Sequence, residues 1–156
     1  MQSATQVSEH EVRHSSNEKI RGKIIKIKDG DTVELLDSLN IKHSVRLAHI
    51  DAPEKNQDYG TVSKNYLGEL CFSKNVVAEK TDTDRNGRWI ALIWEKEVNV
   101  NLEMVKAGMA WHYKAYSKDK SFANAENQAR NSKLGLWSMS NPISPWDFRK
   151  SRKKPK

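Results

Sequence analysis

The chain has 156 residues, enough for one domain with its own hydrophobic core, and it carries a formal net charge of +7. No apolar run is long enough to cross a membrane as a helix, so we expect no membrane partner. The single cysteine, Cys71, excludes an intramolecular disulfide and a cysteine-based metal site, and its helical neighbours predict a place in the core.

The two ends of the chain differ from its middle. Residues 1–19 are polar, without periodicity and without the apolar segment of a signal peptide, so we expect a disordered N-terminal arm. Residues 149–156, RKSRKKPK, contain six Lys or Arg and no acid, and without them the remaining net charge is +1. This basic C-terminal tail either holds a polyanion or is a solvated end. Residues 20–148 remain as the domain, and Trp146 is expected to pin the root of the tail to it.

The apolar pattern predicts a mixed fold. Strands are expected at residues 21–28, 32–36, 42–50, 75–82 and 88–95. Helices are expected at residues 61–74, 100–108 and 121–137, the last two closed by Gly108 and Gly135. Five short strands with a helix after the third are typical of a small curved sheet closed into a barrel. The sequence therefore predicts an α+β fold, a five-stranded OB-fold β-barrel with three α-helices.

The first predicted hairpin turn carries two carboxylates, in the stretch KIKDGDTVELL at residues 26–36. Asp-Gly is the commonest dipeptide in two-residue turns, because Gly accepts a positive φ and Asp tolerates one. Alone, this stretch indicates an ordinary hairpin. Asp29 and Asp31 become candidates for a functional site only in combination with acids elsewhere in the chain.

A second group of acids follows the third predicted strand, in RLAHIDAPE at residues 46–54. Asp51 lies just past the apolar strand end, Pro53 prevents further pairing in a central ladder, and Glu54 follows at once. Acids and proline also end strands for purely structural reasons. Because this loop and the first turn both follow strands of one small sheet, Asp31 and Asp51 are able to converge. Two carboxylates, a backbone carbonyl and waters form an all-oxygen site suited to Ca²⁺, Mg²⁺ or Mn²⁺.

Two arginines occupy comparable places beside predicted strands. Arg46 is flanked by apolar residues within the third strand, and Arg88 opens the fifth. A buried Arg–Asp pair explains such an arginine without catalysis, whereas guanidinium groups facing phosphate oxygens explain it functionally. Arg46 and Asp51 are an odd number of residues apart, so they meet only if a bend or bulge lies between them. A cation, two guanidiniums and a carboxylate such as Glu54, which orients or deprotonates water, are what phosphodiester hydrolysis requires.

A series of motifs connects these residues along the chain. They are DGDT at 29–32, RLAHIDAPE at 46–54, DRNGR at 84–88, VNLEMVKAGMAW at 100–111, ARNSKLGLW at 129–137 and PWDFRK at 145–150. In this order and spacing they resemble the motifs of the thermonuclease family, the staphylococcal-nuclease-like enzymes, over about residues 21–150. The resemblance implies an OB-type barrel with three helices. It also implies Ca²⁺-dependent cleavage of DNA and RNA that leaves 3′-phosphates.

The resemblance assigns cation ligands by motif position. Asp31 and Asp51 are expected as carboxylate ligands of Ca²⁺, and Asp29 is expected near the ion through water. The backbone carbonyl of Ala52 is expected as a further ligand. Ala52 stands where the staphylococcal enzymes have Thr, a change that keeps the carbonyl and removes a hydroxyl.

The resemblance also assigns residues to the substrate. Glu54 is expected to act on the attacking water, while Arg46 and Arg88 are expected to bind the scissile phosphate and its transition state. Tyr113 and Tyr116 fall near the positions of substrate-contacting tyrosines. Relatives further imply a bacterial protein that is secreted or periplasmic, and we expect a monomer whose partners are DNA and RNA substrates.

Two alternatives to the enzyme are open. The first is a non-catalytic nucleic-acid-binding OB-fold module, because tandem relatives of this family have lost their acids and serve as scaffolds. The second assigns all polyanion binding to the tail at residues 149–156 and leaves the barrel a structural role. The complete set of acids and arginines favours the enzyme.

Overall fold

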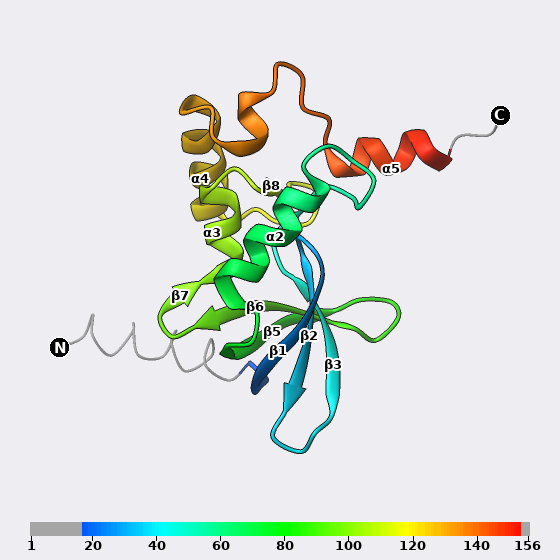
Figure 1. The fold of residues 1–156 in the computed structure, drawn as a ribbon, viewed down its shortest axis with the longest axis vertical. Coiled ribbons are helices and arrows are strands. Elements are labelled where there is room, and N and C mark those ends of the chain that lie inside the picture. The colour runs from blue at the N-terminus through cyan, green and yellow to red at the C-terminus, as the bar shows by residue number, and fades with distance from the viewer. Residues whose placement is uncertain (1–16, 154–156) are drawn as a thin grey trace.

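The computed structural model describes residues 17–153, except for the side chain of Lys153, and it contains a closed barrel. The strands are β1 (Lys19–Asp29), β2 (Thr32–Asp37), β3 (Lys42–Leu47), β4 (Ile50–Asp51), β5 (Asn75–Thr83), β6 (Trp89–Glu95), β7 (Val98–Asn99) and β8 (Trp111–His112). The order β3-β2-β1-β5-β6 is closed by a parallel pairing of β3 with β6 (Figure 1). The predicted five-stranded barrel and the α+β class are confirmed.

The long strand β1 belongs to both halves of the barrel. Residues 19–23 pair antiparallel with residues 75–79 of β5, and residues 22–29 pair with β2. The ladder with β2 shifts register between Ile24 and Lys26 and again just before the turn. Such bulges bend a strand and increase its twist, which lets β1 leave one partner and curve onto the other.

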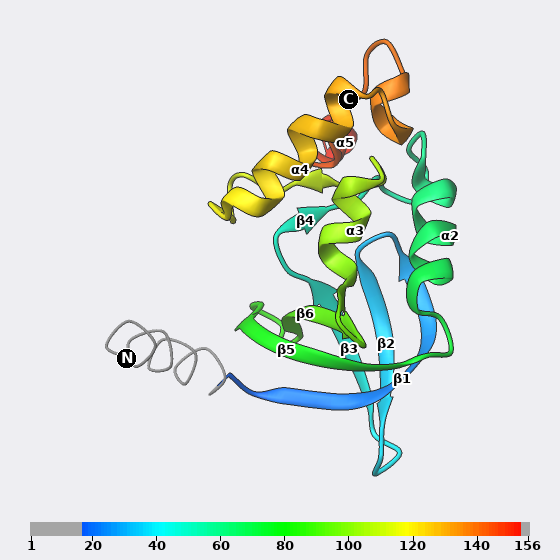
Figure 2. The ribbon, with the colours of Figure 1, turned by 90° about the vertical axis from the view of Figure 1, so that its left-hand side faces the viewer.

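The helices gather at one end of the barrel. They are α2 (Gly60–Cys71), α3 (Val100–Lys106), α4 (Lys120–Asn131) and α5 (Pro145–Lys153), with a 3₁₀ turn, η1, at Gly135–Ser138. Helix α2 contacts β1, α3 contacts α2 and β6, and α4 packs against α3 (Figure 2). Side-chain caps fix two helix starts, because the Asn99 and Asp119 oxygens accept bonds from Leu102 N–H and Ser121 N–H, 3.0 and 2.8 Å long.

The barrel interior and the inner helix faces form one apolar core. Its fully buried members include Ile24, Leu35, Val45, Leu47, Ile50, Leu67, Ile93, Met104 and Phe122. Cys71 belongs to this core, as predicted, and burial raises the pKa of its thiol to about 12. A smaller cluster joins Trp111, Ala129, Leu136 and Trp137 under α4 and η1.

The structure shortens three predicted elements, and one of them, the helix predicted over 61–74, ends at Cys71. The strand predicted over 42–50 ends at Leu47, because His49 takes a left-handed conformation with φ 73°, and only Ile50–Asp51 continue as β4. The helix predicted over 121–137 ends at Asn131. There Lys133 adopts φ 56°, and Leu134 N–H donates to the Ala129 carbonyl, which closes the last turn before Gly135 is reached.

The C-terminal segment also differs from expectation. Helix α5 is a fourth helix, and it continues through Arg149, where the sequence predicted the start of a basic tail. Trp146 packs against Trp111 and Tyr113, which confirms its predicted role in holding this segment to the domain. Residues 1–16 of the predicted N-terminal arm lie outside the described residues, and Lys19 already belongs to β1. No helix among residues 17–153 is long and apolar enough to span a membrane.

Candidate active site

The β1–β2 turn is tied to the loop that follows β4. The Asp31 carbonyl accepts a 2.8 Å hydrogen bond from Leu47 N–H, and its carboxylate Oδ2 accepts one of the same length from Ala52 N–H. The turn residue Gly30 is not among the glycines with positive φ. Its lack of a side chain serves close packing instead, because a Cβ there would lie 1.9 Å from Ser63 Oγ and 2.8 Å from Ala52 Cβ.

Asp51 reaches the site through the bend at His49. Strand β4 pairs antiparallel with β8, with Asp51 opposite Trp111. The left-handed His49 changes the direction of the chain between Arg46 and Asp51, which is the bend that their odd spacing required. Asn101, fully buried, holds this turn by donating to the Ala48 and Ala91 carbonyls at 3.0 Å.

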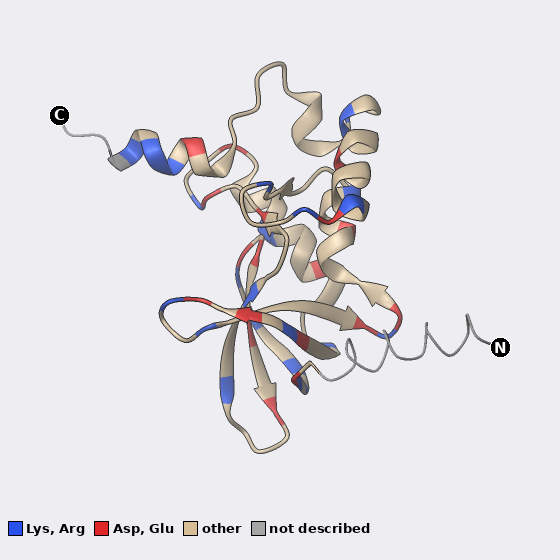
Figure 3. Cartoon of the chain, turned by 180° about the vertical axis from the view of Figure 1, so that it is seen from behind, with Lys and Arg blue, Asp and Glu red and all other residues tan. Residues whose placement is uncertain are grey.

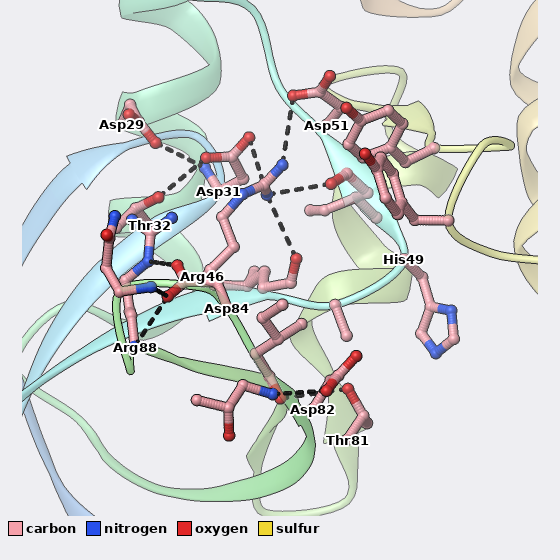
Figure 4. A pocket seen from close by; sticks show the side chains of 18 of the residues that line it. Asp29, Asp31, Thr32, Arg46, His49, Asp51, Thr81, Asp82, Asp84 and Arg88 are labelled. Carbon is pink, nitrogen blue, oxygen red and sulfur yellow. Dashed lines mark hydrogen bonds and ion pairs between the residues drawn. The ribbon is translucent and has the colours of Figure 1, made fainter.

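Arg46 joins the two predicted cation ligands. Its Nη1 lies 3.1 Å from Asp31 Oδ2 and its Nη2 lies 3.4 Å from Asp51 Oδ1 (Figure 4). The exposed side-chain fractions are 17% for Arg46, 9% for Asp31 and 1% for Asp51, so this ion-pair cluster is largely removed from water. The structural interpretation of Arg46 as a buried partner of acids therefore holds. The same contacts bring Asp31 and Asp51 together. The functional interpretation, in which the Arg46 guanidinium faces phosphate oxygens, stays a prediction.

A third arginine, Arg149 of α5, enters the site and was not predicted. Its Nη2 donates to Asp51 Oδ2 at 2.8 Å and its Nη1 to Asp51 Oδ1 at 3.2 Å. Nη1 also donates to Glu54 Oε2 at 2.7 Å, and Nη2 lies 3.4 Å from the Tyr113 hydroxyl oxygen. In the sequence Arg149 is one of several basic residues near the C-terminus, and only PWDFRK, which contains it, hinted that this segment belongs to the domain.

Arg88 lies in the same cavity as these groups, but it has a different partner. Its Nε donates to Asp84 Oδ2 at 2.8 Å, and its side chain is 36% exposed. Asp84 also accepts from the backbone N–H groups of Asn86 and Arg88, which shapes the β5–β6 turn. Thus the structure brings Arg88 to the cavity without joining it to the Asp31 and Asp51 cluster.

One open cavity contains every predicted site side chain except Ala52. Its lining includes Asp29, Asp31, Arg46, Asp51, Glu54, Arg88, Tyr113, Tyr116 and Arg149. The rings of Tyr113 and Tyr116 meet edge to face with centroids 4.7 Å apart, and Tyr116 is 78% exposed at the rim. In the close-up view Asp31 and Arg46 lie between Asp29 and Asp51, and Arg88 lies on the side away from Asp51 (Figure 4).

Burial acts differently on the three aspartates. It raises the pKa of Asp29 to about 7, and the adjacent Asp31 carboxylate adds to this effect. Burial also raises the pKa of Asp51 to about 6, against the hydrogen bonds from Arg149. For Asp31, burial is outweighed by the Arg46 charge and the hydrogen bonds to its oxygens, so its pKa is lowered. Asp31 is therefore the most firmly anionic of the three.

The donors of this site fit a hard divalent cation. Asp31 and Asp51 contact one guanidinium, so their oxygens already surround a positive charge. All the groups concerned are oxygen donors, the type that Ca²⁺ and Mg²⁺ prefer. Within residues 17–153, no three Asp, Glu, His or Cys side chains are clustered closely enough to hold a metal ion alone. Backbone carbonyl, water or substrate oxygens would therefore have to complete the coordination.

The barrel, its end-on helices and its acid–arginine cavity define a class of small OB-fold nucleases, and sequence comparison agrees. The profile of the family described as staphylococcal nuclease homologue matches residues 44–139. The chain therefore belongs to the staphylococcal nuclease homologue family.

Several bacterial relatives align with this chain over most of their own length. A protein of Haemophilus influenzae named "Uncharacterized endonuclease" is 44% identical over 138 residues, which cover 88% of this chain and 78% of the relative. A protein of the same name from Escherichia coli O157:H7 is 40% identical, with 83% and 85% covered. The "Micrococcal nuclease" of Shigella flexneri is 36% identical, with 85% and 82% covered.

Proposed function

We propose that the protein is an endonuclease that hydrolyses the phosphodiester bonds of DNA and RNA with Ca²⁺ as its cation and leaves 3′-phosphates. The observation that carries this proposal is the contact of Arg46 with both Asp31 and Asp51 in a cavity that also contains Glu54 and Arg88. Membership of a nuclease family and relatives named as endonucleases support it.

The cation is assigned to the part of the cavity lined by Asp31 and Asp51. The Asp31 and Asp51 carboxylates and the Ala52 carbonyl would hold it, and Asp29 would contact it through water. A divalent cation bound there supplies Lewis-acid stabilisation of the charge that develops on the phosphate oxygens. The firmly anionic state of Asp31 suits a ligand that must be ionised before it binds a cation.

The remaining side chains act on water and phosphate. Glu54 orients or deprotonates the attacking water, whose oxygen forms a bond to phosphorus while the P–O5′ bond breaks. Arg46 and Arg88 stabilise the negative charge on the phosphate oxygens in the transition state. Both guanidiniums are held in place by carboxylates, Arg46 by Asp31 and Asp51, and Arg88 by Asp84.

The tyrosines are assigned to the nucleotide next to the cleaved bond. Tyr116 is exposed at the rim, and Tyr113 lies deeper, within reach of Arg149. Aromatic rings beside a phosphate-binding cavity offer stacking surfaces to bases of any sequence. This arrangement favours little dependence on the sugar or the base, since no contact to a 2′-hydroxyl is required for catalysis.

The proposal is tested by incubating the protein with single-stranded DNA, duplex DNA and RNA, with CaCl₂ or with a chelator. We expect chelator-sensitive cleavage of all three substrates and 3′-phosphate ends on the products. Glu54→Gln should keep substrate binding and lose cleavage by about 10²-fold or more, whereas Glu69→Gln, an exposed acid on α2, should cleave normally.

Binding without cleavage by the intact protein would instead support the non-catalytic OB-fold module. Removal of residues 149–156 would delete the basic tail and also the Arg149 contact with Asp51. A loss of polyanion binding in that variant would therefore not show whether the tail or the cavity binds the polyanion. Truncation after Lys150 is the cleaner test of the tail. The secreted or periplasmic location and the monomeric state stay predictions.

A further inference from the structure

Arg149 binds the same carboxylates that the proposed function needs for the cation and the water. Asp51 Oδ2 receives Arg149 Nη2 at 2.8 Å, and Glu54 Oε2 receives Nη1 at 2.7 Å. Asp51 Oδ1 receives two guanidinium groups, Arg149 at 3.2 Å and Arg46 at 3.4 Å. Both oxygens of this carboxylate, which is only 1% exposed, are therefore engaged by arginine.

Arg149 is presented by an anchored helix and not by a free chain end. Trp146, one turn earlier on α5, stacks nearly parallel on Tyr113, with centroids 5.4 Å apart and an angle of 6°, and packs edge-on against Trp111. Ser144 Oγ accepts from Asp147 N–H at the start of α5, and Gln57 Nε2 donates to the Ile143 carbonyl at 2.6 Å. These contacts fix the base of α5 beside the cavity.

The outer part of α5 leaves the body of the protein. Figure 1 shows the helix extending away from the barrel and the other helices, and Figure 3 shows basic residues along its outer part. Lys150 and Arg152 are exposed. Apart from Arg149 itself, the contacts described above are made by the first turn of α5 and the residues before it. The contact of Arg149 with Asp51 and Glu54 is therefore the outermost of these attachments.

A guanidinium and a divalent cation compete for these oxygens. Buried Asp51 needs a positive partner, and bidentate arginine is a strong one in a site shielded from water. A cation bound by the same carboxylate would face the Arg149 charge at contact distance, where the repulsion between like charges is large. Binding of Arg149 to these carboxylates therefore weakens cation binding, and cation binding weakens the Arg149 contact by the same factor.

We propose that Arg149 is a positioning residue that holds Asp51 and Glu54 in the cation-free protein and is exchanged for the divalent cation, which frees the outer part of α5. This inference rests on the proposed cation dependence. Arg149 then competes with the cation for the same carboxylates. The cation concentration needed for activity therefore depends partly on how firmly α5 holds Arg149 in the site.

The first test is calorimetric titration of the intact protein with CaCl₂, without nucleic acid. Arg149→Gln is expected to bind Ca²⁺ about tenfold more tightly than the wild type, because the competing charge-assisted bonds are gone. Lys150→Gln removes the same charge from the next, exposed position, and it should bind Ca²⁺ within about twofold of the wild type. Arg149→Lys, which keeps the charge without the bidentate fork, should lie between the two.

The second test is amide hydrogen exchange over residues 145–153, which reports α5 directly. CaCl₂ should speed exchange in the outer part of α5 of the wild type. In Arg149→Gln the exchange should be fast already and insensitive to Ca²⁺. Melting temperatures of all variants, measured alongside, separate local release of α5 from global loss of stability.

The outcomes distinguish the two proposals. If Arg149→Gln binds Ca²⁺ no more tightly than the wild type and amide hydrogen exchange in α5 is unchanged, the replacement of Arg149 by the cation is refuted. Ca²⁺-dependent cleavage can still stand in that case. If Lys150→Gln gains as much Ca²⁺ affinity as Arg149→Gln, the proposal is also refuted. The gain would then come from the loss of any nearby positive charge and not from the Arg149 contacts. If neither the wild type nor Arg149→Gln binds Ca²⁺ and cleavage continues in the presence of a chelator, the proposed cation dependence is refuted. The replacement of Arg149 by the cation is then refuted as well.

Discussion

The Asp31 carboxylate accepts a 2.8 Å hydrogen bond from the Ala52 backbone N–H, which joins two loops 21 residues apart in the sequence. This bond places the β1–β2 turn beside the loop after β4. It positions one predicted carboxylate ligand next to the residue whose carbonyl is expected as another. A side-chain-to-backbone hydrogen bond thus holds the two acidic loops together.

Arg46→Gln is expected to lower the free energy of unfolding by about 2–4 kcal/mol, because it leaves the buried Asp31 and Asp51 without that guanidinium. Arg88→Gln breaks a more exposed pair with Asp84 and should cost less than about 1 kcal/mol. Both variants should lose cleavage activity. Urea unfolding and cleavage assays on the two proteins check this, and equal stability losses would contradict the assignment of Arg46 to a buried cluster.

Gly30→Ala is expected to destabilise the protein by about 1–3 kcal/mol, because the new Cβ would meet Ser63 Oγ and Ala52 Cβ. Gly68→Ala on α2 is the matched control. Its nearest neighbour would be 3.8 Å away, so the helix should gain up to about 1 kcal/mol. Ser63→Ala should partly rescue Gly30→Ala in thermal unfolding, and no rescue would show that contact with the Ser63 hydroxyl is not the source of the cost.

The burial of His49 and His112 makes the stability of the protein depend on pH. His49 Nδ1 and His112 Nε2 lie 2.7 and 2.9 Å from Ser117 Oγ, and burial lowers the pKa of both imidazoles. Below their usual pKa near 6.5, the unfolded chain binds protons that the folded protein does not, so stability falls as the pH falls. Above that pKa the contribution is fully present.

The measurement is urea unfolding of the wild type and His49→Gln at pH 8 and pH 5.5. The wild type should lose more stability between these values than the variant. The raised pKa of Asp29 acts in the opposite direction, because its contribution to stability is lost as the pH rises toward 7. This contribution is the same in both proteins, so it cancels in the comparison. An identical loss in both proteins would exclude His49 as a source of the pH dependence.

The sequence was most informative where local rules decide the structure. The strand pattern predicted the barrel, and acids at strand ends predicted that Asp31 and Asp51 meet. The odd spacing of Arg46 and Asp51 predicted a bend, which His49 supplies. The role of Gly30 was misread, because its constraint is tertiary contact with α2 and not a turn conformation.

The sequence was least informative where distant segments meet. Arg149 is 98 residues from Asp51, and nothing in a run of basic residues marks one of them as the partner of a buried acid. The helix predicted over 121–137 was too long for a similar reason, because contacts between distant segments decide where it ends. Apolar spacing continues past Asn131, but the left-handed Lys133 turns the chain so that Leu136 and Trp137 pack from η1.

We propose that the Asp31 and Asp51 loops together bind one divalent cation. The direct measurement is calorimetric titration of the wild type, Asp31→Asn and Asp51→Asn with CaCl₂ in the absence of nucleic acid. We expect a single Ca²⁺ site in the wild type, and each substitution should weaken its affinity by about tenfold or more. Undiminished Ca²⁺ binding by both variants would contradict it.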